Sequence, residues 1–207
     1  MELNSKQEHI LNIAMQLFAD KGYSATSVRE IASAANVNLS MISYYFGGKY
    51  GLLNAIVSSK ADQLKIRMEK MTNENWTSAD EKISALVDEL VDRFWSNRTI
   101  YGVIHHEQNF KGNEELKDAI VELRRVRYYQ FKKVIESGRE RGFFKKEINI
   151  PLLHASVIGM LKHINFSDDF YFNELGIKND AKGDKMMLHE VKEHITNLFK
   201  LLLNENK

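Results

Sequence analysis

Apolar residues recur at intervals of three and four along almost the whole chain, which is the spacing typical of helices that bury one face. The first such stripe consists of Ile10, Ile13, Ala14, Leu17 and Phe18. No run of four residues alternates between apolar and polar positions as a half-buried strand does. The chain has a single proline, Pro151, so almost nothing interrupts helical hydrogen bonding. The pattern therefore predicts an all-α protein.

Three short helices are predicted near the start of the chain. Their ends are marked by residues that satisfy free backbone groups at helix termini or that leave helical geometry. The first helix begins at a capping box of Ser5 and Glu8 and ends at Gly22. The second begins at a capping box of Ser27 and Glu30 and ends at Ala34, and the third is capped by Asn38 and ends at about Tyr45. Helices this short bury little surface alone, so we expect them to pack as a compact unit on the long helix that follows.

Longer helices are predicted after Gly47-Gly48. They cover about 49–71, 78–94, 113–141, 151–165 and 184–204. Ser78 with Glu81 forms a capping box, and Pro151 suits the first turn of a helix. Residues 166 to 184 carry no clean stripe, so we expect a long loop there.

Composition and charge narrow the classes of function. The 29 Lys and Arg residues nearly balance the 28 Asp and Glu residues. The net charge therefore does not predict that the protein is attracted to DNA or to membranes. Without cysteine the chain forms no disulfide, thiolate zinc site or thiol nucleophile. The first residues lack a secretory signal and no window approaches the roughly 18 apolar residues of a membrane span, so we expect a soluble cytoplasmic protein. Motifs of phosphate loops, GxSxG hydrolases and His-carboxylate metal sites do not occur, so neither an enzyme nor a cofactor is expected.

The segment 26–46 has the pattern of two helices joined by a tight turn. Asn36 in the turn tolerates a left-handed backbone, and Val37 and Ile42 supply the apolar anchors that fix the second helix against the first. The outward face of the second helix and its N-terminal end then carry Asn38, Leu39, Ser40, Ser43 and Tyr44. Small polar side chains there can approach base edges in a major groove, which predicts a helix-turn-helix.

These residues resemble the TetR family of bacterial transcriptional regulators. The matching positions are Ala14, Leu17, Phe18, Gly22, Tyr23, Thr26, Val28, Arg29, Glu30, Ile31, Ala32, Ala35, Val37, Tyr45, Phe46, Lys49, Leu52 and Leu53. The resemblance covers about the first quarter of the chain; the remainder resembles the family in architecture only. It implies a helix-turn-helix DNA-binding domain over 1–48 and a helical effector-binding and dimerisation domain over 49–207. It also implies a homodimeric repressor that binds double-stranded operator DNA and is released by a small molecule.

The resemblance further implies which residues contact DNA. They are Thr26, Ser27, Arg29, Asn38, Leu39, Ser40, Ser43, Tyr44, Tyr45 and Lys49. Thr26, Ser27 and Lys49 would contact phosphates, and Tyr44 and Tyr45 the DNA backbone. The base edges would be contacted by Asn38, Leu39, Ser40 and Ser43. Two departures from the family are Ser43, where a Tyr is usual, and the loose Gly47-Gly48 pair. The four basic and four acidic residues within 1–57 cancel, so we expect weak non-specific DNA binding with a shallow salt dependence.

Aromatic residues of the middle helices are candidates for an effector pocket, with plain core packing as the alternative. The pocket candidates are Leu64, Met68, Phe94, Tyr101, His105, Phe110, Tyr128 and Phe131. Together they suggest a largely apolar effector. Adjacent histidines on a helix point about 100° apart, so His105 and His106 chelate a metal badly and no metal site is expected. The run Arg124, Arg125 and Arg127 fits either a solvated face or recognition of an anionic ligand.

The last two helices are the candidates for dimer contacts, because the earlier of them is apolar on most of its faces. The interface residues predicted from their stripes are Leu153, Val157, Leu161, Val191, Ile195, Leu198 and Leu202. The alternative is a monomeric bundle core. Two alternatives to the regulator also remain at this point: an architectural or cell-cycle DNA-binding factor without an inducer, and a small-molecule binding protein whose helix-turn-helix no longer binds DNA.

Overall fold

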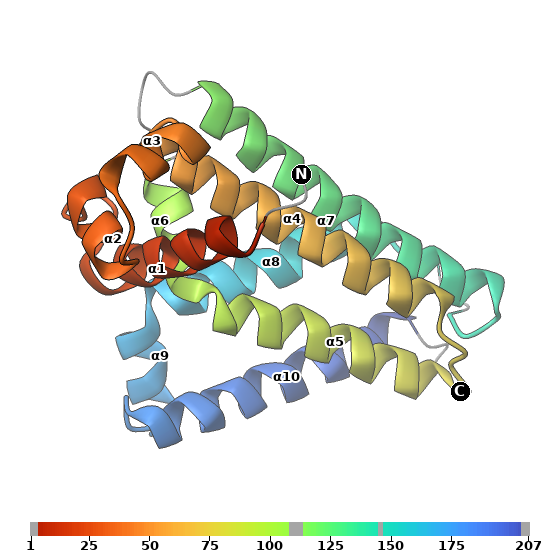
Figure 1. Cartoon of the computed structure of the whole chain (residues 1–207). Helices are drawn as coiled ribbons and strands as arrows, with labels where there is room; N and C mark the ends of the chain where they lie inside the picture. The colour runs from red at the N-terminus through yellow and green to blue at the C-terminus, as the bar shows by residue number, and fades with distance from the viewer. Residues whose placement is uncertain (1–3, 108–113, 145–146, 204–207) are drawn as a thin grey trace. The chain divides into compact units, whose positions relative to one another are not determined.

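The computed structural model describes residues 4–107, 114–144 and 147–203, and in these residues it contains ten helices and no strand (Figure 1). The helices are α1 (Ser5–Lys21), α2 (Val28–Ala34), α3 (Leu39–Phe46), α4 (Lys49–Asn73), α5 (Ala79–Ser96), α6 (Arg98–Glu107), α7 (Glu114–Glu140), α8 (Ile150–Phe166), α9 (Asp168–Glu174) and α10 (Ala181–Leu203). The all-α prediction is confirmed. None of the helices in the described ranges is both long and apolar enough to cross a membrane.

The chain forms two compact units that do not follow the order of the sequence. The first unit comprises Met1–Lys65 and Thr99–Arg127, and the second comprises Ile66–Arg98 and Tyr128–Lys207. Both α4 and α7 therefore contribute residues to each unit. The domain boundary suggested between residues 48 and 49 stays a prediction.

Local caps explain where the helices of the first unit begin. The capping box of α1 lies one residue earlier than expected: the Asn4 side chain accepts a hydrogen bond from the Gln7 amide, and the Gln7 side chain accepts one from the Asn4 amide, each at 2.9 Å. The capping box predicted at Ser5 and Glu8 is therefore wrong by one residue. The cap of α2 is as predicted, since the Ser27 hydroxyl accepts from the Glu30 amide at 3.1 Å.

The turn between α2 and α3 has the backbone geometry predicted for it. Among the described residues, Asn36 is the only one other than glycine with a positive φ, which is +52°. Its amide donates to the Ser33 carbonyl at 3.1 Å, and the Val37 amide donates to the Ala32 carbonyl at 3.0 Å. At the other end of α3, Gly47 adopts the left-handed conformation with a φ of +69° and ends the helix.

The core of the first unit collects apolar side chains from six helices. They include Ile10, Ala14 and Phe18 of α1, Ile31 of α2, Ile42 and Phe46 of α3, Leu52, Leu53 and Val57 of α4, Ile100 and Ile104 of α6, and Leu116, Ile120 and Leu123 of α7. α2 and α3 are too short to be stable as isolated helices, so this shared core holds them in place.

A close approach between α4 and the end of α3 requires a glycine. A Cβ on Gly51 would overlap the backbone carbonyl oxygen of Phe46. Any other residue at this position would push α3 and the start of α4 apart. The role of Gly51 could not be predicted from the sequence, because this glycine lies inside a helix where nothing in the local pattern signals a contact.

The second unit pairs α5 with α10. The predicted apolar stripe of α5 is buried and consists of Ile83, Leu86, Val87, Leu90 and Phe94. The Ser78 hydroxyl caps this helix by accepting from the Glu81 amide at 3.1 Å. On α10 the buried positions are Gly183, Met187, Val191, Ile195, Phe199 and Leu203. The stripe expected there is therefore only partly right: Leu198 and Leu202 are half-buried.

The loop expected over residues 166 to 184 is wrong for part of its length. α9 covers Asp168–Glu174, and α10 already begins at Ala181. Phe172 and Ile177 from this segment are buried, so tertiary packing stabilises a helix too short to show a stripe. Pro151 lies in the first turn of α8, as predicted.

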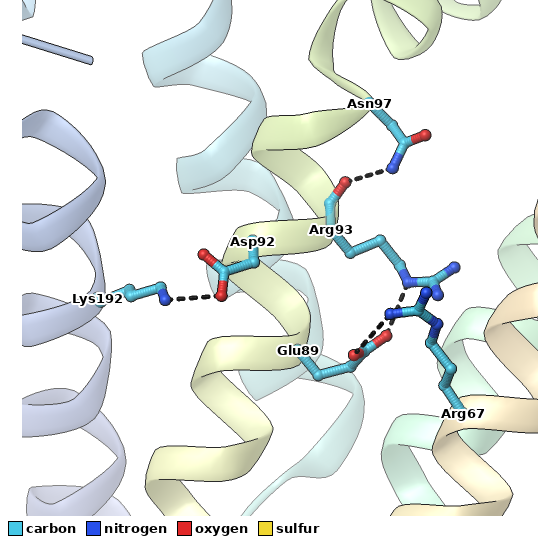
Figure 2. A network of polar contacts seen from close by, with 6 residues as sticks. All are labelled: Arg67, Glu89, Asp92, Arg93, Asn97 and Lys192. Carbon is cyan, nitrogen blue, oxygen red and sulfur yellow. Dashed lines mark hydrogen bonds and ion pairs between the residues drawn. The ribbon is translucent and has the colours of Figure 1, made fainter. Parts of the chain in front are cut away.

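Charged residues link α4, α5 and α10 of the second unit (Figure 2). Lys192 on α10 lies 2.8 Å from a carboxylate oxygen of Asp88 and 2.8 Å from one of Asp92, both on α5. On another side of α5, Glu89 accepts from Arg93 at 2.8 Å and lies 3.8 Å from Arg67 of α4. Burial lowers the pKa of Lys192, but its hydrogen bonds to Asp88 and Asp92 outweigh this, so the pKa lies above its ordinary value.

Candidate nucleic-acid interface

α3 separates its buried and exposed residues sharply. Ile42 and Phe46 are buried against the core of the first unit. Ser40, Ser43 and Tyr44 are exposed, and Tyr44 keeps 84% of its surface. One side of this helix therefore anchors it, and the remainder presents side chains that base edges and phosphates can reach.

The polar side chain at the N-terminal end of α3, that of Asn38, does not cap the helix. Asn38 occupies the cap position, yet its side chain makes no capping hydrogen bond, although its backbone carbonyl accepts from the Met41 amide at 2.9 Å. Both Asn38 and Leu39 are exposed. The Asn38 amide group can therefore donate to and accept from an external partner, which is the chemistry that reads adenine in a major groove.

Thr26 is a correction to the predicted set of DNA contacts. Thr26 is only 1% exposed. Its hydroxyl donates towards the carbonyl oxygens of Gly22 at 2.8 Å and Leu17 at 3.1 Å. Thr26 therefore fixes the connection between α1 and α2 and has no free hydroxyl to offer a phosphate. The neighbouring Ser27 and Arg29 are exposed, as a DNA contact requires.

Tyr45 and Lys49 lie beside the exposed face of α3 and are themselves partly buried. The Lys49 ammonium donates to the Ser24 carbonyl at 3.3 Å and lies 4.3 Å from the centre of the Tyr23 ring. These contacts hold the Lys49 side chain close to the α1–α2 connection. A phosphate contact by Lys49 stays a prediction.

An open groove of about 530 Å³ runs beside the helix-turn-helix. Its lining residues are Ser5, Lys6, His9, Ala32, Ser33, Asn36, Val37, Asn38 and Met41. His9 is held there by a 3.2 Å contact between its Nε2 and the Ala35 carbonyl oxygen. Lys6 and His9 were missed as candidates, because the sequence gives no sign that the start of α1 lies beside the turn.

The charges of this surface largely cancel. Lys21 and Glu30 form an ion pair, and the hydrogen bond from Lys21 is the main reason that the pKa of Glu30 lies below its ordinary value. Arg29 and Lys6 remain as exposed cations near the helix-turn-helix. The surface is therefore better suited to specific polar contacts than to a strong general attraction for phosphates.

Comparison with known proteins agrees with this geometry. The model of the family described as bacterial regulatory proteins, tetR family, matches residues 10–56, which include α2 and α3. The chain is 30% identical over 151 residues to the "Probable HTH-type transcriptional regulator YttP" of Bacillus subtilis, covering 72% of this chain and 71% of that protein. The chain belongs to the TetR family. Members of this family are DNA-binding transcriptional regulators.

Solved structures of two regulators extend the likeness in fold over most of the chain. The transcriptional regulator FadR of Bacillus subtilis, solved in complex with stearoyl-CoA, is 20% identical with a TM-score of 0.68, over 91% of this chain and 97% of that one. A regulator from Saccharomonospora viridis in complex with choline is 16% identical with a TM-score of 0.74, over 97% and 98%. At these identities the likeness concerns the fold alone.

The residues predicted to line a TetR effector pocket are distributed over both units. Leu64, Met68, Phe94 and Phe131 are buried, and Tyr101 and Tyr128 are half-buried. The side chain of His105, and Phe110 as a whole, lie outside the described residues, as do the side chains of His106 and Glu107. The pocket stays a prediction. Within the described residues, no three His, Asp or Glu side chains cluster as metal ligands would.

The residues predicted for the dimer interface need correction. The side chains of Leu153, Val157, Leu161, Val191 and Ile195 are buried within the chain itself. They belong to the core of the second unit and leave no surface for a second copy to cover. Leu198 and Leu202 keep part of their surface. The dimer itself stays a prediction.

Proposed function

We propose that the protein is a homodimeric repressor that binds an operator through α2 and α3 and is released from it by a small-molecule effector. The observation that carries the proposal is the exposed polar face of α3, supported from behind by Ile42 and Phe46. In a dimer, two copies of α3 would enter successive major grooves about 34–36 Å apart. The protein would act in the cytoplasm, where operator DNA is accessible.

The proposed DNA contacts follow from exposure. Asn38, Leu39, Ser40 and Ser43 would approach base edges, while Ser27, Arg29, Tyr44, Tyr45 and Lys49 would contact the phosphate backbone. Thr26 is left out because its hydroxyl is buried. With few cations nearby, specificity would come from these short polar contacts in two half-sites.

Exposed apolar side chains in the last part of the chain support the dimer. Large hydrophobic residues that keep about half or more of their surface are Leu152 and Phe166 of α8, Phe170 of α9, Leu175, and Met186 and Leu201 of α10. A contiguous exposed apolar surface marks a site that a partner covers. We propose that a second copy covers this surface, together with the half-buried Leu198 and Leu202.

The dimer proposal is tested by sedimentation equilibrium at micromolar concentration. The double variant Leu152→Glu with Leu201→Glu is expected to sediment as a monomer, because charges would be buried without partners. Ile66→Glu serves as the matched control, since Ile66 is 68% exposed on α4 and away from the proposed surface in sequence. A dimer in both variants would refute the surface, and a monomeric wild type would refute the dimer.

The effector would bind in the helical body and be largely apolar. Buried and half-buried aromatic and methionine residues in α4 to α7 support this, and the two fold neighbours described above hold stearoyl-CoA and choline. α4 contributes residues to both units, so we propose that effector binding shifts the operator-binding helices through it. Thermodynamic reciprocity then requires operator DNA to weaken effector binding by the same factor.

Operator selection tests the central proposal. Random duplex DNA is enriched on the purified full chain at near-physiological salt, and the recovered sites are titrated with the protein by fluorescence anisotropy. Recovery of a palindromic site is the expected result, and Asn38→Ala with Tyr44→Ala should abolish its binding. A folded protein that enriches no sequence would favour a small-molecule binding protein without DNA activity. Binding with a steep salt slope and little sequence preference would also contradict the proposal.

A further inference from the structure

A half-buried arginine, Arg127, continues the buried apolar stripe of α7. Leu116, Ile120 and Leu123 are buried at intervals of four and three residues, and the next position in this series is Arg127. A core stripe normally continues with an apolar side chain at such a position. The arginine thus departs from the pattern that the same helix follows elsewhere in the first unit.

The Arg127 guanidinium has no counter-charge among the residues that the structure describes. Its Nε is fully buried without a hydrogen-bond partner, and no carboxylate forms an ion pair with it. The titratable groups that act on its pKa are the Tyr101 phenol on α6, which raises it, and the Arg124 guanidinium, which carries a charge of the same sign and lowers it. By contrast, Arg125 is exposed and pairs with Glu122 at 3.3 Å.

Burial of an unpaired cation costs free energy, so such a group is usually retained because it has a functional role. Burial lowers the pKa of Arg127 below its ordinary value; Tyr101 opposes that fall and Arg124 adds to it. A guanidinium stays protonated even so, because its ordinary pKa is far above neutral. The charge therefore persists, and an anion that accepts a hydrogen bond from the buried Nε would stabilise it.

We propose that Arg127 binds the anionic group of the effector, beside the Tyr101 phenol, and that the effector is an amphipathic anion. Its apolar part would be covered by the apolar side chains of the body, and its carboxylate or phosphate would accept hydrogen bonds from the guanidinium. The planar guanidinium is suited to both groups, because its parallel N–H bonds match their paired oxygens. This inference rests on the proposed function only in assigning the anion to the effector.

The same charge restricts the effectors that can bind. A cation such as choline, which the regulator from Saccharomonospora viridis holds, would be repelled by the guanidinium, which has no counter-charge among the described residues. A neutral apolar molecule would leave the buried charge unpaired. Arg127 would thus act as the residue that selects anionic effectors over molecules of similar size and shape.

Three probes that share a twelve-carbon chain test the inference: dodecanoate, dodecyl phosphate and the uncharged methyl dodecanoate. Binding to the full chain is measured by isothermal titration below the micelle concentration of each probe, and choline is titrated as the cationic control. At least one of the two anions is expected to bind about tenfold or more tightly than the ester, and the better anion identifies the headgroup. Equal affinity for all three probes, or no binding by either anion, would overturn the inference.

Variants then assign the effect to Arg127. Arg127→Met should remove the preference for the anion while keeping the affinity for the ester, and Arg127→Lys should keep part of the preference. Arg125→Met is the matched control, because it removes an exposed arginine two positions away on the same helix. An unchanged preference in Arg127→Met would overturn the inference. If that variant does not fold, the comparison of probes on the wild type still decides.

Operator titration separates this inference from the proposed function. Anion binding through Arg127 in a protein that selects no operator would refute the regulator and leave the anion site standing. Operator binding that no twelve-carbon anion weakens, together with no anion preference, would refute the anion site and leave the regulator standing.

Discussion

Replacement of the buried Lys82 by methionine tests how the second unit accommodates a charge. Lys82 on α5 is 0% exposed, and its ammonium donates to the Ser137 hydroxyl of α7 at 2.5 Å. Burial and, to a smaller extent, the charge of Arg141 lower the pKa of Lys82 from 10.5 to about 8, against the opposing effect of Glu140. At neutral pH the folded protein therefore holds a charged lysine in an unfavourable environment.

The size of the effect follows from linkage between protonation and folding. A pKa that falls from 10.5 to about 8 lowers the free energy of unfolding by about 3 kcal/mol at pH 7 and by about 1.4 kcal/mol at pH 9.5. The sign is set by the unfolded chain, which binds more protons than the folded one between these two pKa values. The contribution of Lys82 to stability therefore becomes less unfavourable as the pH rises through this window.

Lys82→Met removes the charge and keeps most of the volume. Ser137 still donates its hydroxyl to the Val134 carbonyl at 3.1 Å, so no buried polar group is left without a partner. We expect the free energy of unfolding to rise by about 2–3 kcal/mol at pH 7 and by about 1 kcal/mol at pH 9.5.

The assay is urea denaturation followed by circular dichroism at both pH values, with Lys133→Met as the control on the exposed side of α7. The control should change the free energy of unfolding by less than about 0.5 kcal/mol at either pH. A Lys82→Met protein that is less stable than the wild type at pH 7 would refute the reasoning. So would a difference between variant and wild type that stays constant with pH.

Further predictions concern the operator-binding unit and the α5–α10 contact. Asn38→Ala or Tyr44→Ala alone should weaken operator binding in an anisotropy titration by about 1–3 kcal/mol each, without changing the melting temperature. Gly51→Ala should lower the free energy of unfolding by about 1–3 kcal/mol despite the better helix propensity of alanine, because its Cβ overlaps the Phe46 carbonyl oxygen at the end of α3. The same variant should weaken operator binding, and an unchanged melting temperature with unchanged binding would contradict this contact. Asn36→Val should cost about 1–2 kcal/mol in urea denaturation, since a β-branched residue resists a φ of +52°. Lys192→Met should cost less than about 1 kcal/mol, and the loss should shrink in high salt, because the ion pairs with α5 are largely exposed; a loss that does not depend on salt would show that packing holds this contact.

Local chemistry could be predicted from the sequence wherever neighbouring residues decide the outcome. Helix stripes, the Ser27 and Ser78 caps, the left-handed Asn36 and the end of α3 at Gly47 all depend on residues a few positions apart. The exposed polar face of α3 belongs to the same class, because helical periodicity alone separates it from Ile42 and Phe46. The helix-turn-helix, and through it the family, therefore followed from the sequence.

Contacts between distant segments were decided only by the tertiary structure. The buried hydroxyl of Thr26 depends on the carbonyl of Leu17, and the need for Gly51 depends on the carbonyl of Phe46. Burial of Val157 and Ile195 within one chain depends on how α8 and α10 pack, which an apolar stripe does not reveal, since a stripe fits a core and an interface equally well. The absence of a counter-charge to Arg127 among the described residues likewise appears only when its three-dimensional neighbours are known. The sequence determines which side chains share a face of a helix, whereas only the tertiary structure determines which residues pack against that face.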